Sequence, residues 1–156
     1  MKKIFLKLLV VFTLISGISC DETKDQTGNF SAEQITELKS IAVEGTWEIA
    51  YFFDTDKEET SNFNGFSFTF NASGALLAVN GTNEINGTWS ITDSSSDDDS
   101  NSESDVDFNI FFSTPLDFEE LSDDWDIVSY TSSRIELKDV SGGNGGIDNL
   151  VFEKKK

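Results

Sequence analysis

From Gly45 onward, apolar and polar residues alternate with a period of two along most of the chain. Phe66, Phe68 and Phe70, for example, are each followed by a small polar residue. Such alternation is typical of antiparallel strands that turn one face to a dry core and the other to water. The pattern predicts strands at 45–54, 63–71, 74–81, 84–92, 105–113, 124–131, 133–139 and 147–154.

Short turns separate most of these strands. The segments 71–74 and 80–83 are rich in Asn and Gly, which favour tight hairpins between consecutive strands. A sandwich needs longer crossovers between its two sheets, so the short loops favour a meander that closes on itself. The expected fold class is therefore all-β: a single up-and-down antiparallel β-barrel of about eight strands over 44–154. Its one long loop, 93–104, is acidic and expected to be disordered.

A short amphipathic helix is expected before the barrel, at 31–43. Ser31 and Gln34 have the spacing of a capping box, and Ile35, Leu38 and Ile41 then fall on one face. A helix of this length is marginal alone, so its apolar stripe should pack on a partner such as one end of the barrel. After Pro115, the segment 116–121 is expected to form a helical turn.

The alternation also predicts which aromatic side chains point into the barrel. The chain has 14 Phe, 3 Trp and 2 Tyr, and most lie on the apolar face of the expected strands. These side chains would either line a pocket for a small hydrophobic molecule or fill the barrel themselves, since a barrel of eight strands is narrow enough for that. The expected inward residues are Trp47, Tyr51, Phe66, Phe68, Phe70, Trp89, Phe108 and Phe112.

The first 19 residues are expected to be a signal peptide, because Lys2 and Lys3 precede an apolar run that is shorter than a membrane span. The segment 16–20, Ser-Gly-Ile-Ser-Cys, resembles a bacterial lipobox, although Gly17 stands where that pattern prefers Leu. The resemblance implies that Cys20 is acylated and anchors the chain in a membrane.

Residues 20–30 are then expected to be a lipid-anchored flexible tether. The acidic stretch 21–25 resembles the segment that accompanies surface export in lipoproteins of the Bacteroidetes. The expected location is therefore the outer membrane of the cell envelope, with the barrel facing the cell surface.

Charge and composition exclude several kinds of chemistry. The formal net charge is −18, and it becomes more negative once the three Lys of the signal peptide are removed, so nucleic-acid binding is disfavoured. The chain has no His and one Cys, which removes the usual general base, zinc ligands and intramolecular disulfide. No nucleophile-elbow, P-loop or dinucleotide motif is found. We expect neither an enzyme nor a cofactor.

No metal site is expected either. The acidic stretch 97–105 offers carboxylates that could hold calcium, but it lacks the spacing and the central Gly of an EF-hand loop. A solvated loop is the simpler interpretation. The paired acids Asp123 and Asp124 would point to opposite faces of a strand, so they do not form a glycosidase pair by themselves.

Two tryptophan motifs and a looser third one mark the strands: Gly45-Thr46-Trp47, Gly87-Thr88-Trp89 and Asp124-Trp125. With the Phe-rich second strand, they resemble the lipocalin-like lipoproteins of the Bacteroidetes over residues 44–154. The resemblance implies a barrel around a hydrophobic pocket and a basic residue that closes the barrel over a Trp. Arg134, the chain's one Arg, would be that residue over Trp47. Typical lipocalins also have a disulfide, which this chain lacks.

Two functions follow from these observations. In the first, a membrane-anchored, monomeric barrel binds a small hydrophobic ligand in its interior at the cell envelope. In the alternative, the barrel is filled by its own side chains and acts as a non-enzymatic surface interaction module for a protein or glycan partner.

Overall fold

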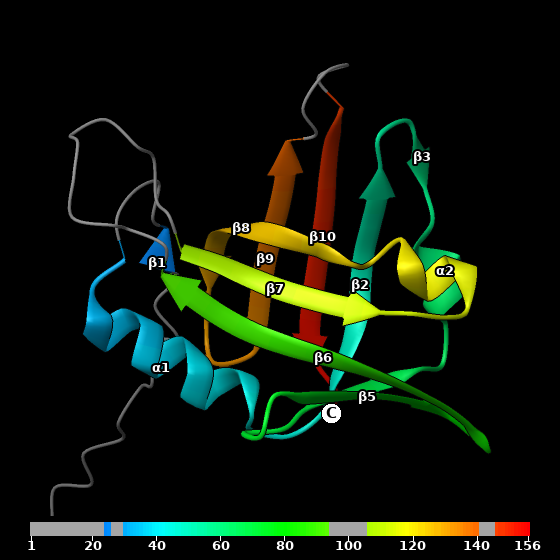
Figure 1. Ribbon diagram of the computed structural model, residues 1–156, viewed down its shortest axis with the longest axis horizontal. Helices are drawn as coiled ribbons and strands as arrows, with labels where there is room; N and C mark the ends of the chain where they lie inside the picture. The colour runs from blue at the N-terminus through cyan, green and yellow to red at the C-terminus, as the bar shows by residue number, and fades with distance from the viewer. Residues whose placement is uncertain (1–23, 26–29, 94–105, 141–145) are drawn as a thin grey trace, which may run out of the picture.

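The computed structural model describes residues 24–25, 30–93, 106–140 and 146–156, in which all but two short helices, a 3₁₀ turn and the connecting loops are β-strand (Figure 1). Each main strand lies within a few residues of the range expected from the alternation. The eight long strands are β2 (Trp47–Asp54), β4 (Ser67–Phe70), β5 (Ala75–Asn80), β6 (Asn83–Asp93), β7 (Val106–Phe112), β8 (Asp123–Tyr130), β9 (Arg134–Val140) and β10 (Ile147–Lys154).

These eight strands form a closed antiparallel up-and-down barrel, which confirms the expected fold class. Consecutive strands pair from β4 through to β10, β8 pairs with β9, and β10 returns to pair with β2. Strands β2 and β4 meet at one pair, Trp47 opposite Phe68, and complete the circle. Two short strands lie off this circle: β1 (Lys24–Asp25) pairs with β8, and β3 (Lys57–Glu58) pairs with β2.

Helix α1 (Ala32–Ala42) lies at one end of the barrel, near the start of β2 and the end of β6 (Figure 1). Its capping box is formed as expected: the Ser31 hydroxyl accepts from the Gln34 amide, and the Gln34 side chain accepts from the Ser31 amide. The helix buries Leu38 and Ala42 against the core. We call this the α1 end of the barrel.

The opposite end, which we call the α2 end, holds a 3₁₀ turn, η1 (Thr60–Phe63), and the short helix α2 (Leu116–Glu119). The helical turn expected after Pro115 is therefore present. Its buried Phe118 inserts among the rings of Phe63, Phe66 and Phe112, with ring centroids 5.0 to 5.3 Å away. Both ends of the barrel are thus covered by short helical segments. None of the helices in the described residues has the length and apolar character needed to cross a membrane.

The three Trp residues anchor the barrel through their indole nitrogens. Trp47 donates to the Ala42 carbonyl at 2.9 Å, Trp89 to the Asn71 carbonyl at 2.9 Å and Trp125 to the Leu121 carbonyl at 3.1 Å. A buried indole N–H needs such a partner, and each bond ties a strand to the segment that precedes or flanks it.

The glycines of the two repeated motifs serve different purposes. Gly45 has a φ of +82°, which L side chains rarely adopt, and so turns the chain from α1 into β2. At Gly87, a Cβ would lie 2.6 Å from the Phe111 carbonyl oxygen and from the Phe112 ring, so the close approach of β7 requires the missing side chain.

Candidate functional site

Most of the aromatic residues expected inside the barrel do lie there. The side chains of Trp47, Phe68, Phe70, Phe108 and Phe112 are fully buried, Trp89 is 7% exposed, and Phe66 is half-buried against the core. Tyr51 is 40% exposed, so the prediction that it points inward is wrong.

A β-bulge explains the outward position of Tyr51. Across β10, Phe152 lies opposite Ile49 and the next residue, Val151, lies opposite Tyr51, so Ala50 has no opposite residue. One extra residue moves every later side chain of β2 to the other face. Phe52 therefore points inward with 1% exposure, and Tyr51 stacks on Phe53 outside the barrel with ring centroids 6.5 Å apart.

The inward rings contact one another across the barrel. The Phe70 ring lies 5.2 Å from Trp89, 5.6 Å from Phe108 and 5.4 Å from Phe152 between centroids, mostly edge to face. Phe68 continues the chain of contacts to Phe152 at 5.6 Å. These are the separations of packed aromatic pairs. Apart from Tyr51, the expected ligand-lining residues thus belong to or pack against the core of the barrel.

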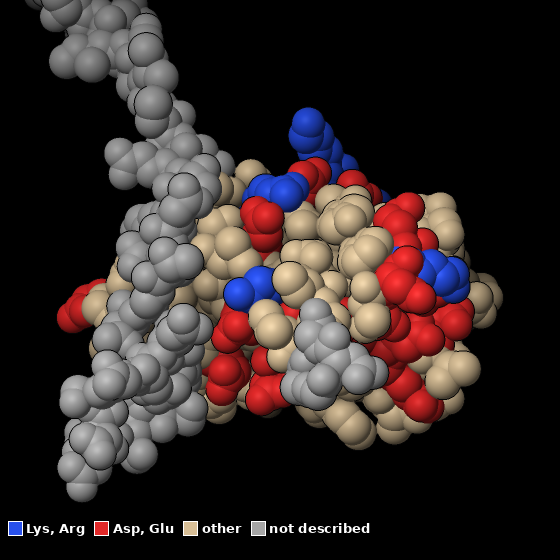
Figure 2. Space-filling view, turned by 90° about the horizontal axis from the view of Figure 1, so that it is seen from above, with Lys and Arg blue, Asp and Glu red and all other residues tan. Residues whose placement is uncertain are grey.

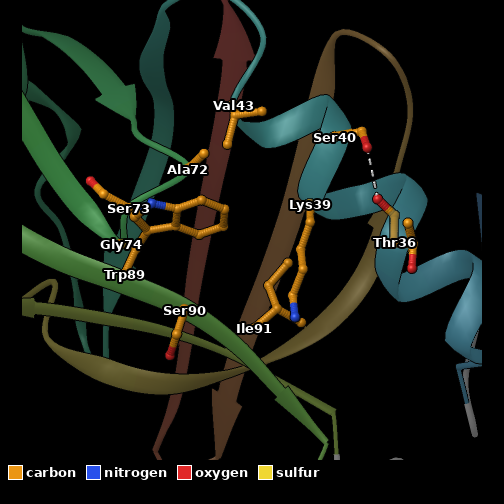
Figure 3. Close-up of a pocket in the computed structure, with 10 residues that line it drawn as sticks. All are labelled: Thr36, Lys39, Ser40, Val43, Ala72, Ser73, Gly74, Trp89, Ser90 and Ile91. Atoms are coloured by element: carbon orange, nitrogen blue, oxygen red, sulfur yellow. Dashed lines mark hydrogen bonds between the residues drawn. The ribbon is translucent and has the colours of Figure 1, made fainter.

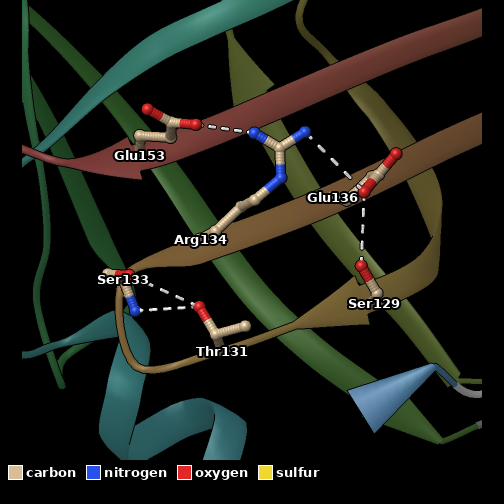
Figure 4. A network of polar contacts seen from close by, with 6 residues as sticks. All are labelled: Ser129, Thr131, Ser133, Arg134, Glu136 and Glu153. Carbon is tan, nitrogen blue, oxygen red and sulfur yellow. Dashed lines mark hydrogen bonds and ion pairs between the residues drawn. The ribbon is translucent and has the colours of Figure 1, made fainter. Parts of the chain in front are cut away.

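Arg134 does not lie over Trp47. Its guanidinium donates to Glu153 at 2.6 Å and lies 3.8 Å from Glu136, which also accepts from Ser129 (Figure 4). The cation over the Trp47 ring is Lys154, with its Nζ 5.3 Å from the ring centroid. The expectation of a basic residue over this Trp is therefore met by the last strand, and the assignment to Arg134 is wrong.

An open groove of about 540 Å³ lies at the α1 end of the barrel, between α1 and the wall formed by β6 and the β4–β5 turn (Figure 3). Three chain segments line it: Thr36, Lys39 and Ser40 of α1 with its C-cap Val43; Ala72, Ser73 and Gly74 from the turn; and Trp89, Ser90 and Ile91 from β6. Its volume is within the range of about 300–1,000 Å³ that is typical of ligand sites.

The helix side of the groove offers few free polar groups. Thr36 donates its hydroxyl to the Ala32 carbonyl at 2.8 Å, and Ser40 donates to the Thr36 carbonyl at 2.9 Å. Both hydroxyls are therefore occupied within the helix. What α1 presents to the groove is the apolar Val43 side chain, which is 37% exposed, and the ammonium of Lys39.

Lys39 differs from most basic side chains of the described residues. Lys57, Arg134, Lys138 and Lys154 each form an ion pair with a carboxylate. Lys39 is exposed and has no ion pair or hydrogen bond in the part of the chain that the structure describes. Its place in the last turn of α1 suits a cation, because the helix dipole is negative there. Its charge remains available to a ligand.

A second feature is the acidic rim of the α2 end, defined as Asp54, Glu59, Glu120, Asp123, Asp139 and Asp148. Figure 2, seen from above, shows many acidic side chains at the right of the molecule and others at its lower left. The rim residues form two groups, Asp54–Glu59–Glu120 and Asp123–Asp139–Asp148, and within each group carboxylate oxygens lie within 4.8 Å of one another. This geometry could hold a cation, and the expectation that the protein binds no metal stays a prediction.

The crowding of the rim alters its ionisation. Desolvation, a hydrogen bond with Asp124 and the charge of Asp139 raise the pKa of Asp123 to about 6. Desolvation and the charge of Asp54 also raise the pKa of Glu120. Two contacts partly offset the repulsion among these carboxylates. Lys57 forms an ion pair with the buried Glu59, and the Thr55 amide donates to Asp148 at 2.5 Å. The rim is thus a site of carboxylate repulsion.

Sequence reasoning missed the groove because its walls come from three separate segments between Thr36 and Ile91 that carry no shared motif. The one sequence signal for this region was the apolar stripe of the helix, which predicted that the helix packs on one end of the barrel. Cys20 and the acidic stretch 97–105 lie outside the described residues.

By its fold, the protein is a closed antiparallel β-barrel with an aromatic core and a helix across one end. No protein-family model matches the chain, and no curated protein matches it. One solved structure, a DUF4847 family protein from Bacteroides vulgatus ATCC 8482, is similar with a TM-score of 0.46 and 17% identity, over 76% of this chain and 98% of that chain. The lipocalin-like resemblance stays a prediction.

Proposed function

We propose that this chain is a lipid-anchored, non-enzymatic interaction module, whose packed barrel is a scaffold and whose groove between α1 and β6 receives a partner at the cell envelope. The observation that carries the proposal is the packing of the interior. The rings that would line a ligand pocket contact one another instead, while the groove lies between α1 and the edge of the barrel. This arrangement favours the second of the two functions expected from the sequence.

The position of the groove suits such a role. It is formed by the helix that directly follows the proposed tether, by a tight turn and by a long strand, so its walls are held by regular structure. Trp47 and Trp89 tie these walls to the barrel through their indole hydrogen bonds. A preformed site costs less conformational entropy on binding than one that must order itself.

Photo-crosslinking in living cells tests the proposal. Val43 lies in the groove and is 37% exposed, whereas Val140, at the opposite end of the barrel, is 51% exposed. Benzoylphenylalanine at position 43 should give a discrete crosslinked product on irradiation, and the same residue at position 140 should not. Equal products at both positions, or none at position 43, would contradict the proposal.

A further inference from the structure

The strand that lines the groove extends beyond its neighbour. Strand β6 has 11 residues and β5 has 6, and the pairing of the two begins with Ala75 opposite Thr88. On its other edge, β6 pairs with β7 as far as Asp93 opposite Val106. From residue 90 onward, no strand of the described residues lies on the β5 side of β6. The groove occupies that side.

The backbone of Ile91 faces this open edge. In an antiparallel strand, the N–H and C=O of every second residue point to the same side. The Trp89 amide donates to the Gly74 carbonyl at 2.9 Å on the β5 side, and the register with β7 is continuous from Gly87 to Asp93. The N–H and C=O of Ile91 therefore also point to the β5 side.

These two groups have no hydrogen-bond partner within the described part of the chain. Ile91 is only 4% exposed, and nearly all buried backbone groups in proteins are paired. Helix α1, on the far side of the groove, cannot pair with a strand edge, because the backbone groups of its middle turns are bonded within the helix and its terminal carbonyls point along its axis. The Ile91 N–H and C=O are therefore a donor and an acceptor without a partner in the described residues, at the bottom of the groove.

We propose, resting on the proposed function of the groove, that its occupant is an extended peptide segment of a partner protein that adds as a strand to the β6 edge and places a carboxylate beside Lys39. A strand supplies the acceptor and the donor that Ile91 needs. Its alternate side chains point to opposite faces, so apolar ones contact Val43 and the Trp89 region while polar ones reach water.

Charge complementarity selects an acidic peptide. The chain carries a net charge of −18, yet the groove presents the ammonium of Lys39 with no carboxylate paired to it. An acidic side chain or a C-terminal carboxylate of the peptide would pair with this ammonium. A glycan fits less well, because sugar rings stack on exposed aromatic faces and Trp89 is only 7% exposed. A fatty acid would leave the Ile91 groups unpaired.

The test begins with random peptides displayed on phage, selected on the purified full-length chain. A selected peptide is then labelled with fluorescein and titrated by fluorescence polarisation. The selected sequences should be rich in β-branched residues and contain an acidic residue or a free C-terminus. Lys39→Glu should weaken binding by about tenfold or more, because it replaces a charge-assisted contact with repulsion. Lys156→Glu makes the same change in net charge at the C-terminal end and should alter affinity by less than about twofold.

Two further measurements separate strand addition from capture of side chains alone. A peptide of the same sequence with N-methyl groups on alternate amides, prepared in both registers, should lose binding in the register that pairs with Ile91. The bound peptide should also slow hydrogen exchange of the Ile91 amide. The Ile85 amide, already in the β5 pairing, serves as the internal control and should not change.

The inference is overturned if no peptide is selected, if Lys39→Glu binds as well as the parent, or if both N-methylated peptides bind unchanged. A glycan array that gives specific binding in place of peptides would also overturn it. If crosslinking at position 43 succeeds while peptides fail, the proposed function of the groove survives and this inference falls. If both fail, both fall.

Discussion

At the residue scale, two aromatic residues that the sequence pattern treats alike, Phe68 and Tyr51, lie in opposite surroundings. Phe68 is fully buried with its ring against Phe118 and Phe152, whereas Tyr51 lies on the outer face because of the bulge at Ala50. Both residues belong to the same predicted set, and only their surroundings in the fold separate them.

Replacing each of the two by Ala measures that difference. Phe68→Ala should lower the free energy of unfolding by about 3–5 kcal/mol, because it leaves a cavity in a packed core. Tyr51→Ala should cost less than about 1 kcal/mol, because its side chain lies on the outer face, 40% exposed, and leaves no cavity in the core. Urea unfolding of both variants gives the comparison. Similar losses in the two variants would show that the register of β2 is misassigned.

The raised pKa of Asp123 predicts a dependence of stability on pH. Because its pKa is about 6 in the folded chain and near 4 in the unfolded chain, folding favours the protonated form. The stability from this group is therefore fully present below about pH 4 and is lost as pH rises through 6. The parent should therefore melt at a higher temperature at pH 5 than at pH 7.

The variant Asp123→Asn isolates the contribution. Its side-chain oxygen can still accept from the Asp124 amide, which lies 2.9 Å from the present carboxylate, but it carries no charge. The variant should be more stable than the parent at pH 7 and lose part of the gain that the parent shows on acidification. Glu84→Gln, an exposed change on β6, should keep the parent's pH profile. An unchanged profile in Asp123→Asn would rule out this origin.

At the element scale, α1 is the part of the molecule that links the barrel to the groove. Its core contacts are Leu38 and Ala42, and the Tyr130 hydroxyl donates to Glu37 at 3.1 Å across the α1 end. Burial and this hydrogen bond raise the pKa of Tyr130 from 10 to about 12, so the hydroxyl stays a donor even in mildly alkaline solution. The helix is thus fixed at both its buried stripe and its outer face.

The cap of α1 can be tested separately. Ser31→Ala removes the acceptor for the Gln34 amide and should lower the free energy of unfolding by about 1 kcal/mol. Ser31→Asp keeps an acceptor at the helix start and should retain most of the stability. Chemical denaturation of the three chains gives the comparison. Equal losses in both variants would mean that the hydroxyl bond is not what stabilises this end.

The elements of the barrel were largely predictable, and their irregularities were not. Alternation located the strands because each has one face in the core, and the capping box located α1. The bulge at Ala50 has no sequence signal, and it reversed the faces of Tyr51 and Phe52. The role of Lys154 over Trp47 depends on β10 pairing with β2, the first strand of the barrel, which periodicity alone does not show.

At the scale of the whole molecule, the proposed anchor would place the barrel at a membrane. The prediction rests on the apolar run before Cys20 and on the lipobox resemblance. Growth with an alkyne fatty acid should label the parent chain and leave Cys20→Ala unlabelled, because the mutant lacks the thiol to be acylated. Ser19→Ala, which keeps a small residue before the Cys, serves as the control and should be labelled. Equal label in Cys20→Ala would contradict the anchor.

The groove could not be predicted from the sequence, because it depends on how the strands and α1 are assembled. It exists because β6 is longer than β5 and because α1 lies across from the extra residues without filling the space beside them, and both are properties of the assembled barrel. The interior was predictable as apolar, but whether it would be open or filled depends on how the rings of Phe70, Phe108 and Trp89 meet, which no single strand determines.

The central claim is that the barrel is filled and does not carry a ligand inside. Titration of the parent chain with N-phenylnaphthylamine, a neutral apolar dye, tests it most directly, with Phe108→Ala as the matched variant. Phe108 is fully buried against Phe70 and Trp89. We predict no saturable fluorescence increase with the parent, because the rings that face its interior contact one another. Saturable binding by the parent that Phe108→Ala weakens would contradict the account and restore the interior as the binding site.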